Sequence, residues 1–211
     1  MAHVKKRNNS IRSSRPQRQH IATMVLRLCS MFVVGLSTLL VVNVCRAQQT
    51  HLTESQVESA YLYNFGKFVT WPSEKISASG SLEICLLGDD PFGTALDSIV
   101  AGEKIDGHPL AVKRIALLEE EDRCNILFIS SSKKSSLRAI LASAERSGIL
   151  TVSDIPHFAE RGGVIGFVLF HDRIRFEVNR HAAEESHLVL SSELLKVASK
   201  VIGKNTRGGG Q

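Results

Sequence analysis

The chain contains none of the short motifs that mark the commonest catalytic and metal-binding sites. It has no HExxH sequence, no CxxC-anchored ligand set, no GxSxG elbow and no Walker loop, so residue spacing supports neither a zinc site nor these classes of hydrolase. Four cysteines in 211 residues are too few for a miniprotein built on disulfides. We therefore predict a protein that is not an enzyme and that holds no metal or cofactor.

Acidic side chains are absent from residues 1–47, which carry eight of the 26 lysines and arginines. The rest of the chain keeps 18 basic against 21 acidic side chains, a net charge of −3. The overall charge of +5 therefore does not describe the folded part, and we predict no nucleic-acid partner. A content of 43% hydrophobic and 22% charged residues excludes a fully disordered or collagen-like chain.

The basic N-terminal segment leads into an uncharged apolar run, residues 28–45. A basic region, an apolar region and a small residue, here Ala47, form the layout of a secretory signal peptide. An uncleaved membrane anchor is the alternative. Because positive charge stays on the cytoplasmic side, both readings export the remainder. We expect residues 1–47 to be a signal peptide and the protein to act in the periplasm.

The exported part alternates short buried strands with helices. Thr53 and Gln56 form a capping box at the start of a helix whose predicted apolar stripe ends at Phe68. We expect helices over 54–69, 91–100, 133–146 and 191–202, and strands over 82–87, 104–105, 110–115, 125–129, 149–152, 164–170 and 173–179. This order predicts an α/β fold in three layers, with a mostly parallel sheet, helices on both faces and a C-terminal antiparallel hairpin. One domain is expected over 48–203, followed by a disordered tail over 204–211.

Ligands of open α/β sheets gather beyond the carboxyl ends of the strands. Here those ends carry Gly88–Asp90, Ser130–Ser132 and Ser153–Asp154. Helix N-termini beside Lys133 and Lys134 could hold an anion, but three aspartates would repel it, so we expect capped, solvated ends. Ser153, Asp154 and His157 have the residue types of a nucleophile and its base, although turn capping explains residues this close together better.

Removal of residues 1–47 leaves Cys85 and Cys124 as the remaining cysteines. Two thiols in one exported domain favour a disulfide, because the compartment is oxidising. The alternative is a pair of buried free cysteines. We predict the disulfide.

Several segments, in order along the chain, resemble the YfiR family of periplasmic regulators. They are AYLYNFGKFVTWP (60–72), ICLLGDDPFG (84–93), LTVSD (150–154), GG (162–163), RIRFEVN (173–179) and LSSELLK (190–196). The resemblance extends from about Gln56 to Val201 and implies a repressor that holds an inner-membrane diguanylate cyclase of the YfiN type inactive by binding its periplasmic sensor region. Cyclic-di-GMP output and biofilm formation would then depend on whether the repressor is bound or is sequestered by an outer-membrane lipoprotein.

The resemblance also implies a homodimer that responds to redox state. The pair Cys85 and Cys124 matches a cysteine pair of the family. Some relatives have a second pair around the Gly-Gly segment, where residues 158–167 of this chain have no cysteine, which puts in doubt any redox switch that depends on that pair.

The partner-binding surface is predicted at the Gly-Gly turn and the hairpin. Its residues are His157, Phe158, Val164, Arg175 and Glu177. Phe158 is either an exposed anchor of the kind that dominates interfaces or a residue that caps the core. If it is an anchor, Phe158→Asp would release the cyclase and leave the fold intact. The alternatives to a repressor are a periplasmic small-molecule-binding protein that serves a sensor or transporter, and a hydrolase.

Overall fold

The computed structural model describes residues 53–72, 80–119 and 123–203. The predicted signal peptide, 1–47, and the predicted disordered tail, 204–211, lie outside these ranges. Within the described ranges no helix is long and apolar enough to cross a membrane.

An eight-stranded sheet with the order β10-β8-β7-β6-β5-β2-β4-β3 runs through the described domain. Its strands are β2 (Leu82–Leu87), β3 (Lys104–Ile105), β4 (His108–Ile115), β5 (Ile126–Ile129), β6 (Leu150–Ser153), β7 (Ile165–Phe170), β8 (Arg173–Asn179) and β10 (Lys200–Ile202). Strands β4, β2, β5, β6 and β7 run parallel to one another, and β10 runs parallel to β8. The pairs β7-β8 and β3-β4 are antiparallel. The predicted mostly parallel α/β fold with a C-terminal hairpin is confirmed.

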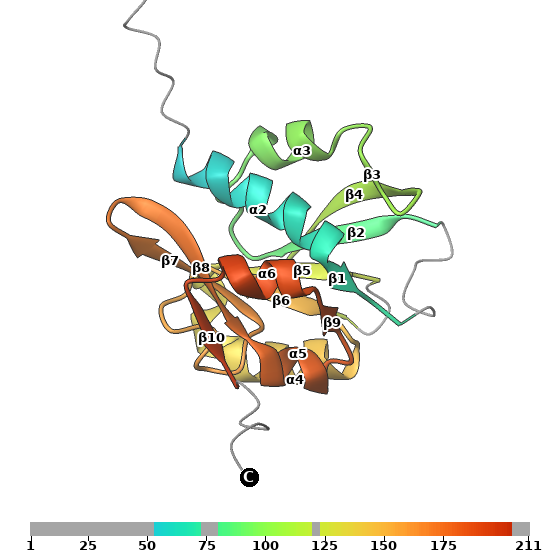
Figure 1. Ribbon diagram of the computed structural model, residues 1–211. Helices are drawn as coiled ribbons and strands as arrows, with labels where there is room; N and C mark the ends of the chain where they lie inside the picture. Colours follow the sequence, from blue (N-terminus) through green and yellow to red (C-terminus); the bar gives the residue numbers. More distant parts are fainter. Residues whose placement is uncertain (1–52, 73–79, 120–122, 204–211) are drawn as a thin grey trace, which may run out of the picture. The chain divides into compact units, whose positions relative to one another are not determined.

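Helices cover both faces of this sheet. They are α2 (Glu54–Phe68), α3 (Thr94–Val100), the 3₁₀ helix η2 (Ser131–Ser136), α4 (Leu137–Arg146), α5 (Arg180–Glu185) and α6 (Ser192–Val197). Helices α2 and α3 lie on one side of the sheet and α4 on the other (Figure 1). A separate two-stranded pair joins β1 (Val69–Thr70) to β9 (Val189–Leu190).

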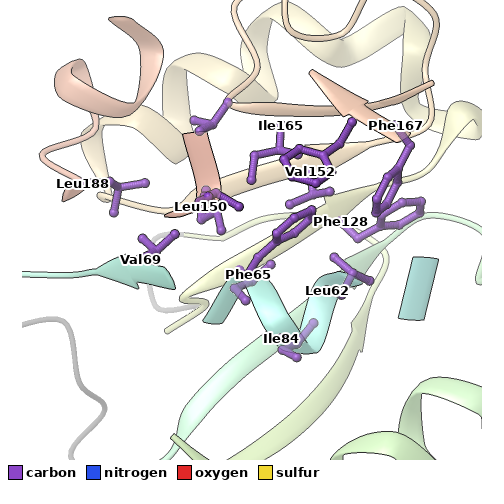
Figure 2. Packing of buried hydrophobic residues seen from close by; sticks show 14 of the residues in the cluster. Leu62, Phe65, Val69, Ile84, Phe128, Leu150, Val152, Ile165, Phe167 and Leu188 are labelled. Atoms are coloured by element: carbon purple, nitrogen blue, oxygen red, sulfur yellow. The ribbon is translucent and has the colours of Figure 1, made fainter. Parts of the chain in front are cut away.

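The central strands are apolar on both faces because helices bury both. In β2, Ile84 and Leu86 belong to the core under α2 and α3, whereas Cys85 and Leu87 belong to the core under α4. This alternation follows from the two-residue period of a strand. Figure 2 shows the ring of Phe65 on α2 in the first core, where it stacks on Phe167 with ring centroids 6.0 Å apart.

The capping box of α2 is confirmed. The Thr53 hydroxyl accepts from the Gln56 backbone N–H, and the Gln56 side chain accepts from the Thr53 N–H. The predicted apolar stripe is shifted, because the face turned to the sheet is centred on Leu62 and Phe65, and Phe68 is exposed. This rotation also places Glu58 on the buried face.

The C-terminal helix is shorter than predicted. It ends at Val197, and the next residues turn into β10 along the outer edge of β8. The backbone N–H and the hydroxyl of Ser199 both donate to the Phe176 carbonyl oxygen. The open edge of β8 offers backbone partners that a local helical pattern cannot reveal, so pairing overrides helix propensity there.

Helix α3 begins three residues later than predicted, because Asp90 caps a turn before it. The Asp90 carboxylate accepts from the N–H groups of Phe92 and Gly93, and its other oxygen accepts from Arg114. The short helix α5 was not predicted. Its N-cap is Asn179, whose side chain accepts a hydrogen bond from the Ala182 N–H. This asparagine was the one sequence feature that could have indicated the helix.

Candidate functional site

The disulfide Cys85–Cys124 is present, and the alternative of two free thiols is wrong. Cys85 lies in β2, and Cys124 precedes the neighbouring strand β5. Their Cα atoms are 5.7 Å apart, within the usual range for a disulfide. Both residues are buried in the core under α4, so the bond ties the middle of β2 to the segment that leads into β5.

Two of the five predicted partner-binding residues are buried. Phe158 and Val164 are each 1% exposed, so neither side chain can touch a partner in this conformation. The reading of Phe158 as an exposed anchor is therefore wrong. A Cβ built on Gly163 would lie 2.0 Å from the Phe158 ring, which shows that the ring packs directly against the glycine backbone. Gly163 therefore makes room for a buried ring, and the turn does not expose that ring.

The other three predicted residues belong to one group of polar side chains, with Arg175 and Glu177 on β8 and His157 in the segment between β6 and β7. The imidazole Nδ1 of His157 lies 3.1 Å from a carboxylate oxygen of Glu160, and the other oxygen of Glu160 lies 2.6 Å from Lys200 Nζ. Lys200 is in register with Glu177 on β8, and Arg175 lies two residues before Glu177. We call these five residues the polar patch.

The charges of the polar patch are mutually adjusted. Hydrogen bonding and attraction by Lys200, with a smaller contribution from His157, lower the pKa of Glu160. The same pair raises the pKa of Lys200, helped by the charge of Glu177. Arg175 is exposed and makes no ion pair within the described part of the chain. The patch therefore presents ordered charges of both signs to solvent.

The tip of the hairpin is apolar and exposed, which sequence reasoning missed. Leu169 and Phe170 are each 59% exposed. Strand β6 pairs with β7 only as far as Gly166, so the end of β7 has β8 as its partner and the hairpin projects from the sheet (Figure 1). Phe170 is in register with Arg173 and shares a face with Arg175. It therefore extends the polar patch with an aromatic side chain.

A cavity of about 560 Å³ lies on the opposite face of the hairpin, beside the start of α2. Its lining residues are Thr53, Glu54, Ser55, Glu58, Pro91, Asp154, Phe167, Val168, Leu169 and Ile174. Burial raises the pKa of Glu58 from 4.5 to about 7, with further contributions from the negative charges of Asp154 and Glu54. Partial burial of its carboxyl group also raises the pKa of Asp154. The cavity is therefore acidic on one side and apolar on the other.

The loops at the other carboxyl ends make internal contacts, as the expectation of capped helix ends predicted. The Ser132 hydroxyl accepts from the Asp89 N–H, and Lys133 Nζ donates to the Ala116 carbonyl. Ser153 is buried and donates to the Ile129 carbonyl, whereas the Nδ1 of His157 pairs with Glu160. The described partners of these side chains are thus structural ones. Among the described residues, no three His, Cys, Asp or Glu side chains are grouped as metal ligands.

Glu58→Gln should make the protein more stable at alkaline pH. The folded state holds a proton on Glu58 up to about pH 7, so stability falls as pH rises from 4.5 to about 7. The glutamine side chain does not ionise and so avoids that loss. We expect the free energy of unfolding to be higher than in wild type by up to about 3 kcal/mol at pH 8 and to be almost unchanged at pH 4.5. Urea unfolding of both proteins at the two pH values measures it, with the exposed Glu145→Gln as control. A Glu58→Gln protein that is less stable than wild type at pH 8 would contradict the assignment.

The fold and the site together define an α/β domain that carries a buried disulfide, a charged face on its C-terminal hairpin and an acidic cavity. Residues 55–199 match the family described as DUF4154, YfiR/HmsC-like, and the chain belongs to that family. No curated protein matches the chain significantly.

Two solved structures show distant likeness. A conserved domain protein from Vibrio cholerae O1 biovar El Tor has a TM-score of 0.45 at 11% identity, over 71% of this chain and 60% of that one. The ABC domain of Streptococcus pneumoniae in complex with L-Trp has a TM-score of 0.42 at 12% identity, over 61% of this chain and 57% of that one. The chain thus spans about three fifths of either protein's length, and likeness at this level carries no argument about function.

Proposed function

We propose that this chain is a periplasmic regulator that binds the periplasmic sensor region of an inner-membrane diguanylate cyclase and represses it. Cyclic-di-GMP and biofilm formation would then rise when the regulator is removed. The observation that carries the proposal is membership of the YfiR/HmsC-like family across 55–199. Export by residues 1–47, assembly as a homodimer and sequestration by an outer-membrane lipoprotein belong to the same proposal.

The buried disulfide supports a periplasmic location. Cys85 and Cys124 lie on adjacent strands within one core, and such bonds persist in oxidising compartments such as the periplasm. The location also places the chain on the same side of the inner membrane as a sensor region.

The polar patch together with Phe170 is the surface we assign to the cyclase. Charges of both signs on β8 and β10 can be matched by a complementary partner, which gives specificity and speeds association. An exposed aromatic side chain beside them suits the anchor role that a few residues fill in protein interfaces. Phe170 replaces Phe158 as the proposed aromatic anchor. His157, Arg175 and Glu177 remain part of the proposed binding surface.

Phe170→Ser should release the cyclase while leaving the fold intact. Loss of a central aromatic anchor costs about 2 kcal/mol or more, equivalent to roughly 30-fold weaker binding. Cyclic-di-GMP in cells that produce the variant should therefore approach the level of cells without the regulator. The matched control is Leu117→Ser, because Leu117 is also exposed and apolar but follows β4, on the other side of the sheet order.

Arg175→Glu tests the charged part of the same surface and should also weaken repression. Thermal unfolding of each variant shows whether it is folded. Full repression by both Phe170→Ser and Arg175→Glu would contradict the assignment of this surface. Loss of repression by Leu117→Ser to the same extent would show that the effect is not specific to the hairpin.

A further inference from the structure

Glu58 is a buried carboxyl group that has no hydrogen-bond or ion-pair partner among the residues that the structure describes. The residue is 8% exposed, lies on the face of α2 that is turned to the sheet, and makes no hydrogen bond or ion pair with any described residue. No fully buried side-chain nitrogen or oxygen in the described residues lacks a hydrogen-bond partner. The carboxyl oxygens of Glu58 are therefore not sealed in the core, and they open onto the cavity that the residue lines.

The charged groups around Glu58 are all acidic. Glu54 faces it from the same helix, and Asp154 faces it from the loop that follows β6. The remaining lining residues are uncharged, so no basic side chain among the described lining residues neutralises the three carboxyl groups. A buried carboxylate among like charges is unfavourable unless it takes up a proton or a cation joins it.

The other walls of the cavity are apolar. Pro91, Phe167 and Ile174 provide flat and branched surfaces opposite the acidic side. A volume of about 560 Å³ lies within the range of small-molecule sites, which combine apolar walls with a few converging polar groups. A hydrated metal ion would leave these apolar walls unused, whereas an amine on an apolar body would use both sides.

We propose that this cavity binds a small organic cation, a primary ammonium group on an aromatic or alkyl body, with the ammonium between Glu58 and Asp154. The ammonium donates three hydrogen bonds, and charged hydrogen bonds to carboxylates are the strong ones. The apolar body packs against Pro91, Phe167 and Ile174. The ligand supplies the positive charge that the described protein lacks at this place.

This site is separate from the surface assigned to the cyclase. Ile174 lines the cavity, whereas Arg175 and Glu177 lie on the opposite face of β8 because successive side chains of a strand alternate. The proposal therefore stands or fails independently of repression by protein contact. Direct binding to the purified protein is its test.

The test is a titration of the protein, purified from cells that export the full chain, with phenethylamine, tyramine and cadaverine. Phenylpropionate is the matched control ligand, since it has an aromatic body and the opposite charge. Calorimetry should show binding of at least one amine and none of phenylpropionate. Glu58→Gln and Asp154→Asn should each weaken binding at least tenfold, and the exposed Glu145→Gln, on α4, should leave it unchanged.

Binding should also depend on pH. Glu58 is mostly protonated at pH 6 and mostly ionised at pH 8, so amine affinity should rise about tenfold between these values. Asp154 and Glu54 are the other acidic groups that face it. Binding by none of the amines, equal binding of phenylpropionate, or unchanged affinity in folded Glu58→Gln and Asp154→Asn proteins would overturn the proposal. Displacement of the amine by calcium at equal concentration would also overturn it, because it would indicate a metal site.

Discussion

Phe158→Ala should lower the free energy of unfolding by about 3 to 5 kcal/mol, the usual cost of removing a buried phenylalanine. The ring is 1% exposed and belongs to the core under α4. It also packs on the backbone of Gly163 and lies close to Gly166, so its removal leaves a cavity bounded partly by backbone, which cannot collapse easily. Phe158→Asp should be more damaging, because it buries a carboxylate with no cation beside it.

Urea unfolding followed by circular dichroism measures this loss. His157→Asn is the matched control, since it changes the preceding residue, whose side chain is 75% exposed and whose positive φ asparagine tolerates, and we expect a change within about 0.5 kcal/mol. A Phe158→Ala protein that unfolds at the same urea concentration as wild type, or a folded Phe158→Asp protein that has lost the cyclase, would restore the reading of Phe158 as an exposed anchor.

Removal of the disulfide should cost about 4 kcal/mol on the chain-entropy model. The bond joins residues 39 apart in sequence, so the unfolded chain gains much freedom when it is broken. For a domain of this size we expect the melting temperature to fall by about 10 °C. The variant to compare with wild type is the double substitution Cys85→Ala with Cys124→Ala, which leaves no unpaired thiol at this position.

The reductant response separates the bond from the packing of the two side chains. Thermal melts with and without dithiothreitol should differ for wild type and coincide for the double variant. Because both cysteines are buried, the folded wild-type protein should resist reduction until it begins to unfold. Free thiols in the exported protein, or a melting temperature that the double substitution leaves unchanged, would contradict a stabilising role.

The sequence was informative wherever the chemistry is local. The capping box at Thr53 predicted the start of α2, and the continuous apolar runs of β2 and β5 predicted strands buried on both faces. The disulfide was predicted because two cysteines remain outside residues 1–47 and the expected compartment is oxidising. The helix start and the strands depend on neighbouring residues, and the disulfide depends on which cysteines remain, so a single sequence is enough to predict these features.

The features that sequence reasoning missed depend on contacts between distant segments. Residues 200–202 look helical by spacing, but the free edge of β8 recruits them as a strand. Phe158 looks exposed beside two glycines, whereas Gly163 accommodates its ring. Glu58 falls outside the predicted stripe of α2, and only the rotation of the helix against the sheet brings it to the acidic cavity. Each outcome was set by packing, which has no local signature.

The most direct test of the proposed function is the rate of cyclic-di-GMP synthesis by a membrane diguanylate cyclase of the same organism, reconstituted in vesicles with its sensor region facing outward. Added outside, the exported chain should inhibit at least one such cyclase in proportion to its concentration, and the Phe170→Ser variant should inhibit it far less. Unchanged synthesis by every such cyclase at saturating amounts of the folded, disulfide-bonded protein would contradict repression by contact.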